Sequence, residues 1–328
     1  MSGIRATFGL ALVGVTIWVL TMIFAPTRGE AAAQTFTSSL QCMDCHAEVY
    51  AEWEGSSHAN SWVNPDVRAL SNDFSNTDCI DCHAPRPIFE TGVGKRVLPR
   101  SSRRNEGVDC IACHLLPDGH IAGTFDDPRA SCRPVAKVDL TREEYCAGCH
   151  DQHQTVQQWR GSRYAEQGIG CIECHMPYRD GDPGRGRDHR CLGGHDLDMV
   201  RSAVDLRGRR DGERWVVELE NVGAGHSFPT DERSRAADLF WRPLAGPGEE
   251  PGPWQQFYRF RSPYRHEVGI VDNLLLVHET RDIPLEAEGA DGPVEVALFY
   301  KLSPYYEDPE RPDPEREARL VHSIELRP

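Results

Sequence analysis

Hydrophobic and polar positions divide the chain into three segments. An uncharged apolar run covers residues 8–25, and between residues 36 and 200 apolar positions are sparse and follow no sustained period. After residue 200 apolar residues alternate with polar ones, as at Trp215, Val217 and Leu219. Alternation at a period of two predicts half-buried β-strands. The chain therefore starts with one apolar helix and ends with a β-rich region.

The β-rich region is predicted to be a β-sandwich. Gly/Pro-rich breaks such as residues 246–248 separate short candidate strands, and six or more of these without helical periodicity are typical of this architecture. The predicted strands are 215–219, 237–241, 255–260, 274–278, 294–300 and 319–326. The fold class is therefore α+β, with a mostly helical or irregular domain over residues 36–200 followed by the β-sandwich domain over 201–328.

The N-terminal apolar run indicates export from the cytoplasm. Its 18 residues exceed the roughly 7–15 of a signal peptide core and fall within the roughly 17–25 of a spanning helix. Residues 31–33 are three alanines, which suit a cleavage site. A cleaved signal peptide and a retained membrane anchor within residues 1–33 both remain open. Since Arg5 is the only charge before the run, both alternatives place residues 34–328 on the periplasmic or extracellular side.

Composition shows that the middle segment cannot form an ordinary core. Leu, Ile, Val and Phe make up 28 of the 165 residues from 36 to 200, about 17%, which is below the level of about 20% expected of a folded domain. From residue 201 onward the count is 30 of 128. The first domain therefore needs another source of apolar surface, which large flat cofactors would supply.

The cysteines indicate what those cofactors are. Ten of the 12 cysteines form five Cys-x-x-Cys pairs, each followed at once by histidine. This is the attachment motif of c-type haem, in which two thiols bond to the porphyrin edge from one helical turn and the histidine is the proximal iron ligand. Five complete motifs behind an export signal exclude zinc knuckles. The motifs are Cys42/Cys45/His46, Cys79/Cys82/His83, Cys110/Cys113/His114, Cys146/Cys149/His150 and Cys171/Cys174/His175. We therefore expect five covalently bound haem c groups.

An internal repeat surrounds two pairs of these motifs. Trp53-Glu-Gly-Ser-Ser-His58-Ala follows the first motif, and Trp159-Arg-Gly-Ser-Arg-Tyr164-Ala follows the fourth. Each repeat unit is predicted to contain a haem motif, the Trp-x-Gly-Ser segment and the next haem motif, so that the first unit ends at Cys79. The two copies differ where His58 becomes Tyr164.

Nine histidines remain to supply distal ligands. Of these, His266, His278 and His322 lie in or near predicted strands and are expected to be bystanders. His226 follows a glycine-rich stretch, residues 221–225, that lets backbone approach a flat group closely.

Four sequence pieces resemble a bacterial multihaem c-type cytochrome family. They are Trp-x-Gly-Ser-Ser-His-Ala and the segments 168–177, 189–195 and 223–230. That family is similar to the superfamily of tetrahaem electron carriers, pentahaem nitrite reductase and hydroxylamine oxidoreductase. The resemblance extends from about residue 40 to the C-terminus and implies that His58, His189, His195 and His226 are distal iron ligands.

One iron then lacks an assigned distal ligand. His120, His153 or a thioether such as Met176 or Met199 could provide it, and an open position is the remaining alternative. The two cysteines outside the motifs, Cys132 and Cys191, suggest a disulfide in an oxidising compartment.

The favoured function is electron transfer along closely packed, mostly bis-histidine haems between redox partners, with no catalytic residue assigned. The β-sandwich would cap one end and could supply His226 to a haem or dock a partner. The formal net charge of −15, with three lysines, favours partners with basic docking faces and excludes a nucleic acid. Membrane contact depends on whether the N-terminal helix is retained.

Two alternatives remain. One is an oxidoreductase that acts on a small nitrogen or sulfur compound at one open haem, with the basic residues Arg96, Arg100, Arg103 and Arg104 as an anion funnel or simply as a solvated loop. All five motifs end in histidine, whereas pentahaem nitrite reductases carry lysine at their catalytic haem. The other is a haem subunit of a larger membrane redox complex or a cytochrome filament.

Overall fold

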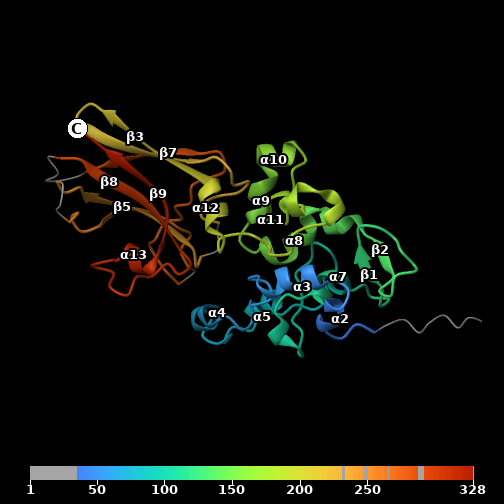
Figure 1. The fold of residues 1–328 in the computed structure, drawn as a ribbon. Helices are drawn as coiled ribbons and strands as arrows, with labels where there is room; N and C mark the ends of the chain where they lie inside the picture. The colour runs from blue at the N-terminus through green and yellow to red at the C-terminus, as the bar shows by residue number, and fades with distance from the viewer. Residues whose placement is uncertain (1–34, 231–232, 247–249, 265, 287–291, 328) are drawn as a thin grey trace, which may run out of the picture.

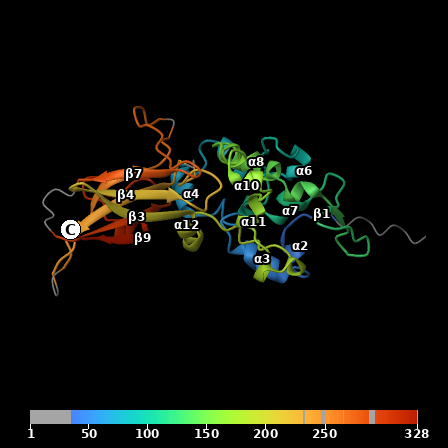
Figure 2. The same cartoon turned by 90° about the horizontal axis from the view of Figure 1, so that it is seen from above.

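The computed structural model describes residues 35–230, 233–246, 250–264, 266–286 and 292–327. The apolar helix expected within residues 1–33 lies outside the described residues. Within the described part of the chain, every helix is too short or too polar to cross a membrane. A helical region and a β-rich region lie side by side with α12 at their junction, and the C-terminus is at the far end of the β-rich region (Figure 1; Figure 2).

The helical region consists of short helices joined by irregular segments, as predicted. The longest helices described here have eight residues, and such helices are not stable in isolation, so tertiary contacts must hold them. They are α2 (Leu40–Met43), α3 (Ala47–Glu54), α4 (Pro65–Leu70), α5 (Asp78–His83), α6 (Ile88–Thr91), α7 (Cys110–His114), α8 (Glu143–His150), α9 (Thr155–Arg160), α10 (Arg163–Glu166), α11 (Cys171–His175) and α12 (Leu197–Ala203). Single 3₁₀ turns lie at Arg104–Glu106, Val138–Thr141, Arg179–Gly181 and Pro183–Arg185. A small parallel pair joins β1 (Ile121–Gly123) to β2 (Pro134–Ala136).

The β-rich region contains two antiparallel sheets. The first has the order β3-β4-β7 and the second the order β6-β5-β8-β9. The strands are β3 (Val204–Asp211), β4 (Arg214–Asn221), β5 (Ala236–Pro243), β6 (Gln255–Phe260), β7 (Thr280–Leu285), β8 (Val294–Lys301) and β9 (Arg319–Leu326), and α13 (Pro314–Glu317) precedes β9. This region thus has the antiparallel sheets that the alternating pattern predicts.

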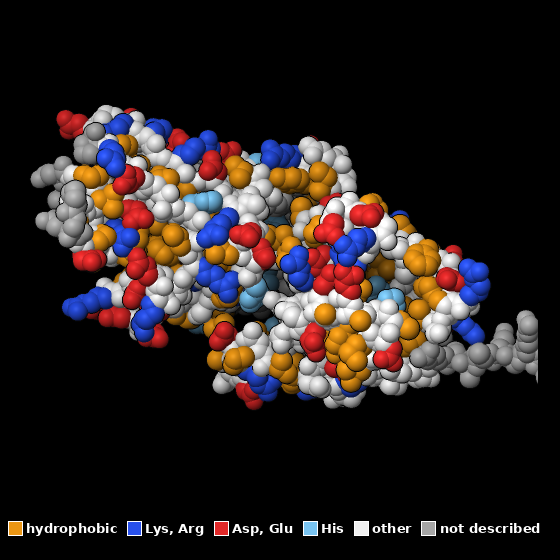
Figure 3. Space-filling view, in the orientation of Figure 1, with side chains coloured by type: hydrophobic (Ala, Val, Ile, Leu, Met, Phe, Trp, Pro, Cys, Tyr) orange, Lys and Arg blue, Asp and Glu red, His pale blue; other side chains and the backbone are white. Residues whose placement is uncertain are grey.

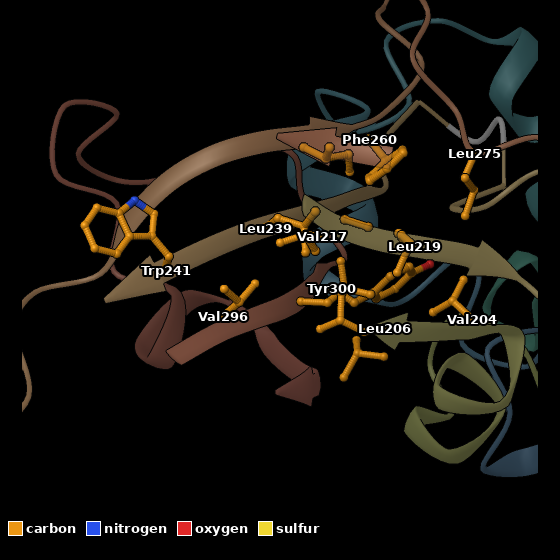
Figure 4. Close-up of a cluster of buried hydrophobic side chains, with 14 of the residues drawn as sticks. Val204, Leu206, Val217, Leu219, Leu239, Trp241, Phe260, Leu275, Val296 and Tyr300 are labelled. Carbon is orange, nitrogen blue, oxygen red and sulfur yellow. The ribbon is translucent and has the colours of Figure 1, made fainter. Parts of the chain in front are cut away.

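The two sheets share one hydrophobic core. Val217 and Leu219 of β4 and Leu239 of β5 are fully buried in the same cluster, together with Val296 of β8. These side chains point from both sheets into the space between them (Figure 4). The alternation in the sequence therefore reflects one face of each sheet packed against the other.

Five of the six predicted strands correspond to β4, β5, β6, β8 and β9. The strand expected at residues 274–278 is wrong, because this segment makes only a single bridge from Leu275 to Phe228. The prediction missed β3 and β7. Arginines along β3 hide its alternation, and Pro284 interrupts β7, which tolerates a proline because it is an edge strand.

The shared core predicts the effect of truncating one side chain in it. Leu239→Ala should lower the free energy of unfolding by about 2–5 kcal/mol, because Leu239 is 0% exposed and its removal leaves a cavity. Leu320→Ala on β9 is the matched control, since Leu320 is 42% exposed and a surface change costs about 0.5 kcal/mol or less. Urea denaturation followed by circular dichroism measures both values. Equal losses in the two variants would contradict this placement of the core.

Candidate functional site

Four of the five Cys-x-x-Cys-His motifs end a short helix at their histidine, in α5, α7, α8 and α11. The two cysteines of each of these four motifs are three residues apart and so lie on one helix face, and the histidine follows in the same turn. In the first motif Cys42 lies in α2, and His46 is the residue before α3. Each motif thus presents two sulfurs and an imidazole from one short segment, as c-type haem attachment requires.

The position of Cys45 in the first motif differs from the predicted one, because the two sulfurs of a motif were expected to lie in one helical turn. α2 ends at Met43, and Cys45 follows in a turn in which its N–H donates to the carbonyl of Cys42 at 3.3 Å. The helix has four residues and none of them is buried, so no packing extends it as far as Cys45.

Exposure also sets Cys45 apart from most motif cysteines. The side chains of Cys45 and Cys174 are exposed, whereas the other eight motif cysteines are half-buried. The covalent bond from Cys45 to haem stays a prediction, at a position open to solvent in this structure.

The first copy of the internal repeat ends at a different haem motif from the one predicted. The indole Nε1–H of Trp53 donates to the carbonyl of Val108 at 2.8 Å, and the N–H of Val108 donates to the carbonyl of His58 at 2.8 Å. Val108 lies two residues before Cys110. The unit that begins at the first motif therefore ends at Cys110 and not at Cys79.

The second copy has the same arrangement. The indole of Trp159 donates to the carbonyl of Ile169 at 3.0 Å, and the N–H of Ile169 donates to the carbonyl of Tyr164 at 2.9 Å. Ile169 lies two residues before Cys171. Residues 60–106, which carry the motif at 79–83, are accordingly an insertion into the first copy.

Cysteines of different motifs contact one another. In both repeat copies, the first cysteine of one motif lies beside the first cysteine of the next motif in that copy. The inserted motif is joined to the fourth. The three contacts are Cys42 with Cys110, Cys146 with Cys171, and Cys82 with Cys149. The motif at 146–150 thus touches two others and lies at a branch point.

Three motif histidines each face a second histidine from a distant part of the chain. The partners are three of the four distal ligands that the family resemblance implies. The ring centroids are 6.0 Å apart for His58 and His150, 6.3 Å for His114 and His189, and 6.3 Å for His175 and His226. The structure therefore brings together histidines that are up to 92 positions apart in the sequence.

This spacing fits a haem iron between each pair of rings. Metal–imidazole bonds are about 2 Å long, and each ring centroid lies about 1 Å behind its nitrogen, so two axial imidazoles have centroids about 6 Å apart. Aromatic rings in direct contact cover a wider range of centroid distances, about 4.5–7 Å, whereas these three pairs all lie at 6.0–6.3 Å. Histidine side chains, in pale blue, are visible in the hollowed middle of the face shown in Figure 3. The residues present thus suit bis-histidine ligation of haem.

Backbone carbonyls orient several of these rings. In each case the Nδ1–H donates to a carbonyl oxygen. Nε2 then carries the lone pair that can bind a metal, and the hydrogen bond fixes the orientation of the ring. The bonds run from His83 to Ser61 at 2.8 Å, from His114 to Ala122 at 2.8 Å, from His175 to Leu192 at 2.6 Å, from His189 to Arg187 at 2.8 Å, and from His226 to Ser227 at 2.9 Å.

Burial favours the neutral form of four histidines in these pairs. It lowers the pKa of His58 to about 4 and that of His226 to about 4, and in both residues the neighbouring motif histidines lower it further. Burial also lowers the pKa of His114 and His189. A neutral imidazole is the form that binds a metal, so these positions are ready for ligation at neutral pH.

The remaining two motif histidines have different surroundings. Among the described residues no second histidine ring lies at this spacing from His46 or His83. His46 is exposed, while the edge of the Phe74 ring contacts His83 with the centroids 5.4 Å apart. These two positions therefore differ from the three paired ones.

Other predicted distal ligands lie elsewhere. The Nε2 of His195 accepts a hydrogen bond from Arg235 at 3.3 Å, and so it faces a guanidinium group in this structure. His120 is beside Asp118, with 3.2 Å between Nδ1 and the carboxylate. His153 is half-buried just after α8. The assignment of these three residues as iron ligands stays a prediction.

The expected bystander histidines make local contacts. His322 donates to the carbonyl of Val204 at 2.9 Å, and the ring of His266 stacks on Tyr264. The Nε2 of His278 accepts the N–H of Arg163 at 3.0 Å, which joins the β-rich region to α10. In the described part of the chain none of the three faces a motif histidine.

The predicted disulfide between Cys132 and Cys191 is not formed. Both cysteines are free thiols, and they lie beside different motifs. Cys132 interacts electrostatically with Cys42, whereas Cys191 interacts with Cys113 and Cys146. The prediction rested on the number of cysteines left outside the five motifs, and this number does not say which motif each of the two residues adjoins.

Three of the four arginines in the basic stretch from Arg96 to Arg104 are paired with carboxylates. Arg96 pairs with Asp78 and Asp81 of α5. Arg100 and Arg103 both reach Asp109, whose carboxylate also caps α7 by accepting the N–H of Ala112 at 2.7 Å. These arginines therefore hold the helices of the second and third motifs.

Phe74 is a residue near the site that sequence reasoning missed. Asn72, Asp73 and Phe74 all have left-handed backbone, with φ of 48°, 57° and 57°. A bulky residue in this conformation is strained. The turn places the Phe74 ring between Trp62, stacked at 4.3 Å, and His83. The Asn-Asp pair is the available sequence signal, since both residues tolerate left-handed backbone.

Comparison with known proteins agrees with these features. Residues 41–115 match the family model described as cytochrome c554 and c-prime. A probable nitrite reductase-hydroxylamine oxidoreductase fusion protein of Kuenenia stuttgartiensis is 25% identical over 153 residues, which is 42% of this chain but 16% of that protein's length. The crystal structure of a penta-heme cytochrome c552 from Thermochromatium tepidum covers 89% of this chain and 98% of its own, with a TM-score of 0.64 and 20% identity. That structure shows the same fold.

The histidine pairs predict a spectroscopic effect for each partner residue. His226→Ala, and separately His58→Ala, should each convert one haem from low spin to high spin, because one axial nitrogen is lost. Low-temperature electron paramagnetic resonance of the oxidised protein measures this change. His266→Ala, at an exposed position outside the pairs, should leave every signal unchanged. An unchanged spectrum in His226→Ala would show that this loop does not ligate iron.

Proposed function

We propose that this chain is an extracytoplasmic pentahaem electron carrier, because residues 41–115 match the cytochrome c554 and c-prime family model and five complete Cys-x-x-Cys-His motifs recur along the sequence. Five covalent haem c groups would be held by the five complete motifs. Haem supplies one-electron chemistry when bound. The chain's own residues attach it, ligate the iron and set the distance between neighbouring groups.

The contact between motifs is the observation that carries this proposal. Cysteines of the first and third, second and fourth, and fourth and fifth motifs lie side by side and interact with each other. Cys113 of the third motif interacts electrostatically with Cys146 and Cys149 of the fourth. All five attachment sites therefore belong to one connected group, so electrons could pass between any two of them without leaving the protein.

The axial residues support a carrier rather than an enzyme. Three motif histidines face a second imidazole whose pKa is lowered by burial. An iron with two histidine ligands has no free position for a substrate. The carbonyl bonds to Nδ1 would fix the ring planes and so tune each potential.

The surroundings of the protein are also part of the proposal. The apolar run at residues 8–25 supports a periplasmic or extracellular location, with either a cleaved signal or a retained anchor. The formal net charge of −15 becomes more negative with haem propionates, which favours redox partners with basic docking faces. Docking should then weaken as the salt concentration rises.

One observation favours a second candidate, an oxidoreductase acting on a small nitrogen or sulfur compound. His46 and His83 are the motif histidines without a second imidazole opposite them in the described structure, so either iron could be open. The relative from Kuenenia stuttgartiensis is a probable nitrite reductase-hydroxylamine oxidoreductase fusion protein. Against an anionic substrate, Arg96, Arg100 and Arg103 are neutralised by carboxylates.

The haem number can be tested directly. Intact-mass spectrometry of the exported protein should give the mature chain plus five haems, since all ten motif cysteines are available in five motifs. Replacing Cys79 and Cys82 together by Ala should remove the mass of one haem. Replacing Cys132 by Ala, outside the motifs, should change the mass only by the substitution. A wild-type mass with fewer haems would overturn the count.

Carrier and enzyme are separated by adding small ligands. Electron paramagnetic resonance of the oxidised protein should show low-spin haems whose signals do not change with nitrite or hydroxylamine. This result follows if every iron has two protein ligands. A high-spin signal that shifts when either compound is added would overturn the carrier proposal and support the oxidoreductase.

A further inference from the structure

Tyr164 occupies the repeat position that His58 occupies in the first copy, but it has a different role. His58 faces His150, the proximal histidine of the fourth motif. Tyr164 instead donates its hydroxyl to the carbonyl of Val222 at 3.1 Å. Val222 directly follows β4 and begins the loop that carries His226. The second repeat copy therefore contacts the β-rich region at the position where the first copy presents an imidazole.

The glycine before His226 lies against this tyrosine. A Cβ atom at Gly225 would be 3.1 Å from Cδ1 of Trp159 and 3.4 Å from Cδ2 of Tyr164. Both aromatic rings thus pack directly on the backbone of the loop, and a side chain at this position would have to displace one of them slightly. The side-chain carbonyl of Gln158 accepts the N–H of Ser227 at 3.1 Å on the other side of His226. Residues of α9 and α10 accordingly hold the loop before and after the histidine.

The same two aromatic residues also hold the segment that leads to the opposite histidine. Trp159 donates to the carbonyl of Ile169, and the carbonyl of Tyr164 accepts the N–H of Ile169. The motif that ends at His175 begins two residues after Ile169. Trp159 and Tyr164 are therefore in contact with both chain segments that present the His175–His226 pair, whose rings are 6.3 Å apart and 11° from parallel.

We propose that Trp159 and Tyr164 are positioning residues that set the ligation of the fifth haem by His226. This inference rests on the proposed bis-histidine coordination of that haem. The reason is geometric. A metal–imidazole bond of about 2 Å tolerates only a small displacement of the ligand, and the ligand here comes from another region of the chain. The two rings fix the loop relative to the motif, and ligation by His226 then depends on this contact between the regions.

Two variants on opposite sides of the contact test this role. Tyr164→Ala removes the ring and the bond to Val222, whereas Gly225→Ala adds a methyl group that pushes the loop away from Trp159. Both should make one haem partly high spin by electron paramagnetic resonance. Both should also let the dithionite-reduced protein bind additional carbon monoxide, up to one molecule per chain, relative to wild type. Gly225→Ala carries the test if Tyr164→Ala does not fold.

Matched controls separate positioning from a general loss of stability. Tyr306→Phe removes a buried tyrosine hydroxyl that donates to Asp238 at 3.0 Å within the β-rich region. Gly292→Ala adds a Cβ atom that has no described residue within 4 Å apart from its chain neighbours. Both controls should keep wild-type resonance signals and carbon monoxide binding. A high-spin haem in either control would contradict a specific role for the α9–α10 contact.

The experiments distinguish an error in the proposed coordination by His226 from an error in the proposed positioning role of Trp159 and Tyr164. If His226→Ala keeps every haem low spin, the coordination on which the inference rests is wrong. If His226→Ala produces one high-spin haem while Tyr164→Ala and Gly225→Ala both match wild type in spin state and carbon monoxide binding, the coordination stands and the positioning role is wrong.

Discussion

The facing of histidine rings from distant segments is the constraint on which the rest of this structure depends. The ring centroids of the three pairs are 6.0–6.3 Å apart, while the histidines come from segments far apart in sequence. His58 must reach His150, and His226 must reach His175 from beyond β4. Short helices with little apolar surface cannot meet such tolerances on their own. Three kinds of contact limit the movement of the paired histidine rings. They are the hydrogen bonds from Nδ1 to backbone carbonyls, the hydrogen bonds of Trp53 and Trp159, and the contact of α9 and α10 with the β-rich region.

A duplicated unit with an insertion explains how the motifs are grouped. Each copy joins two motifs through a tryptophan that donates to the carbonyl two residues before the second motif. The insertion at 60–106 brings in the motif at 79–83, whose Cys82 contacts Cys149 of the other copy. The fourth motif thereby touches motifs from the insertion and from its own copy. A connected group of five attachment sites results from two local units and one added segment.

Inside the helical region, charged side chains are paired at the start of a motif helix. The formal net charge is −15, yet Arg100 and Asp109 are both buried and paired with each other. A buried ion pair adds little net stability, but it is costly to break. It therefore fixes the start of α7 more than it strengthens the fold. Because an Arg–Asp pair is neutral as a whole, the rest of the chain keeps the net negative charge.

The sequence by itself determined the motifs, the proximal histidines and most strands, because these depend on residues close together in the chain. Adjacent cysteines and histidines form a local attachment site, and alternation reports a strand with one buried face. Pairings between distant residues, and the exposure of Cys45, were decided only by the tertiary structure. The free thiols of Cys132 and Cys191, the partner of Trp53 and the role of Tyr164 all depend on which segments pack together. Composition and local spacing do not encode that packing, since it is selected by the sum of many contacts across the folded chain.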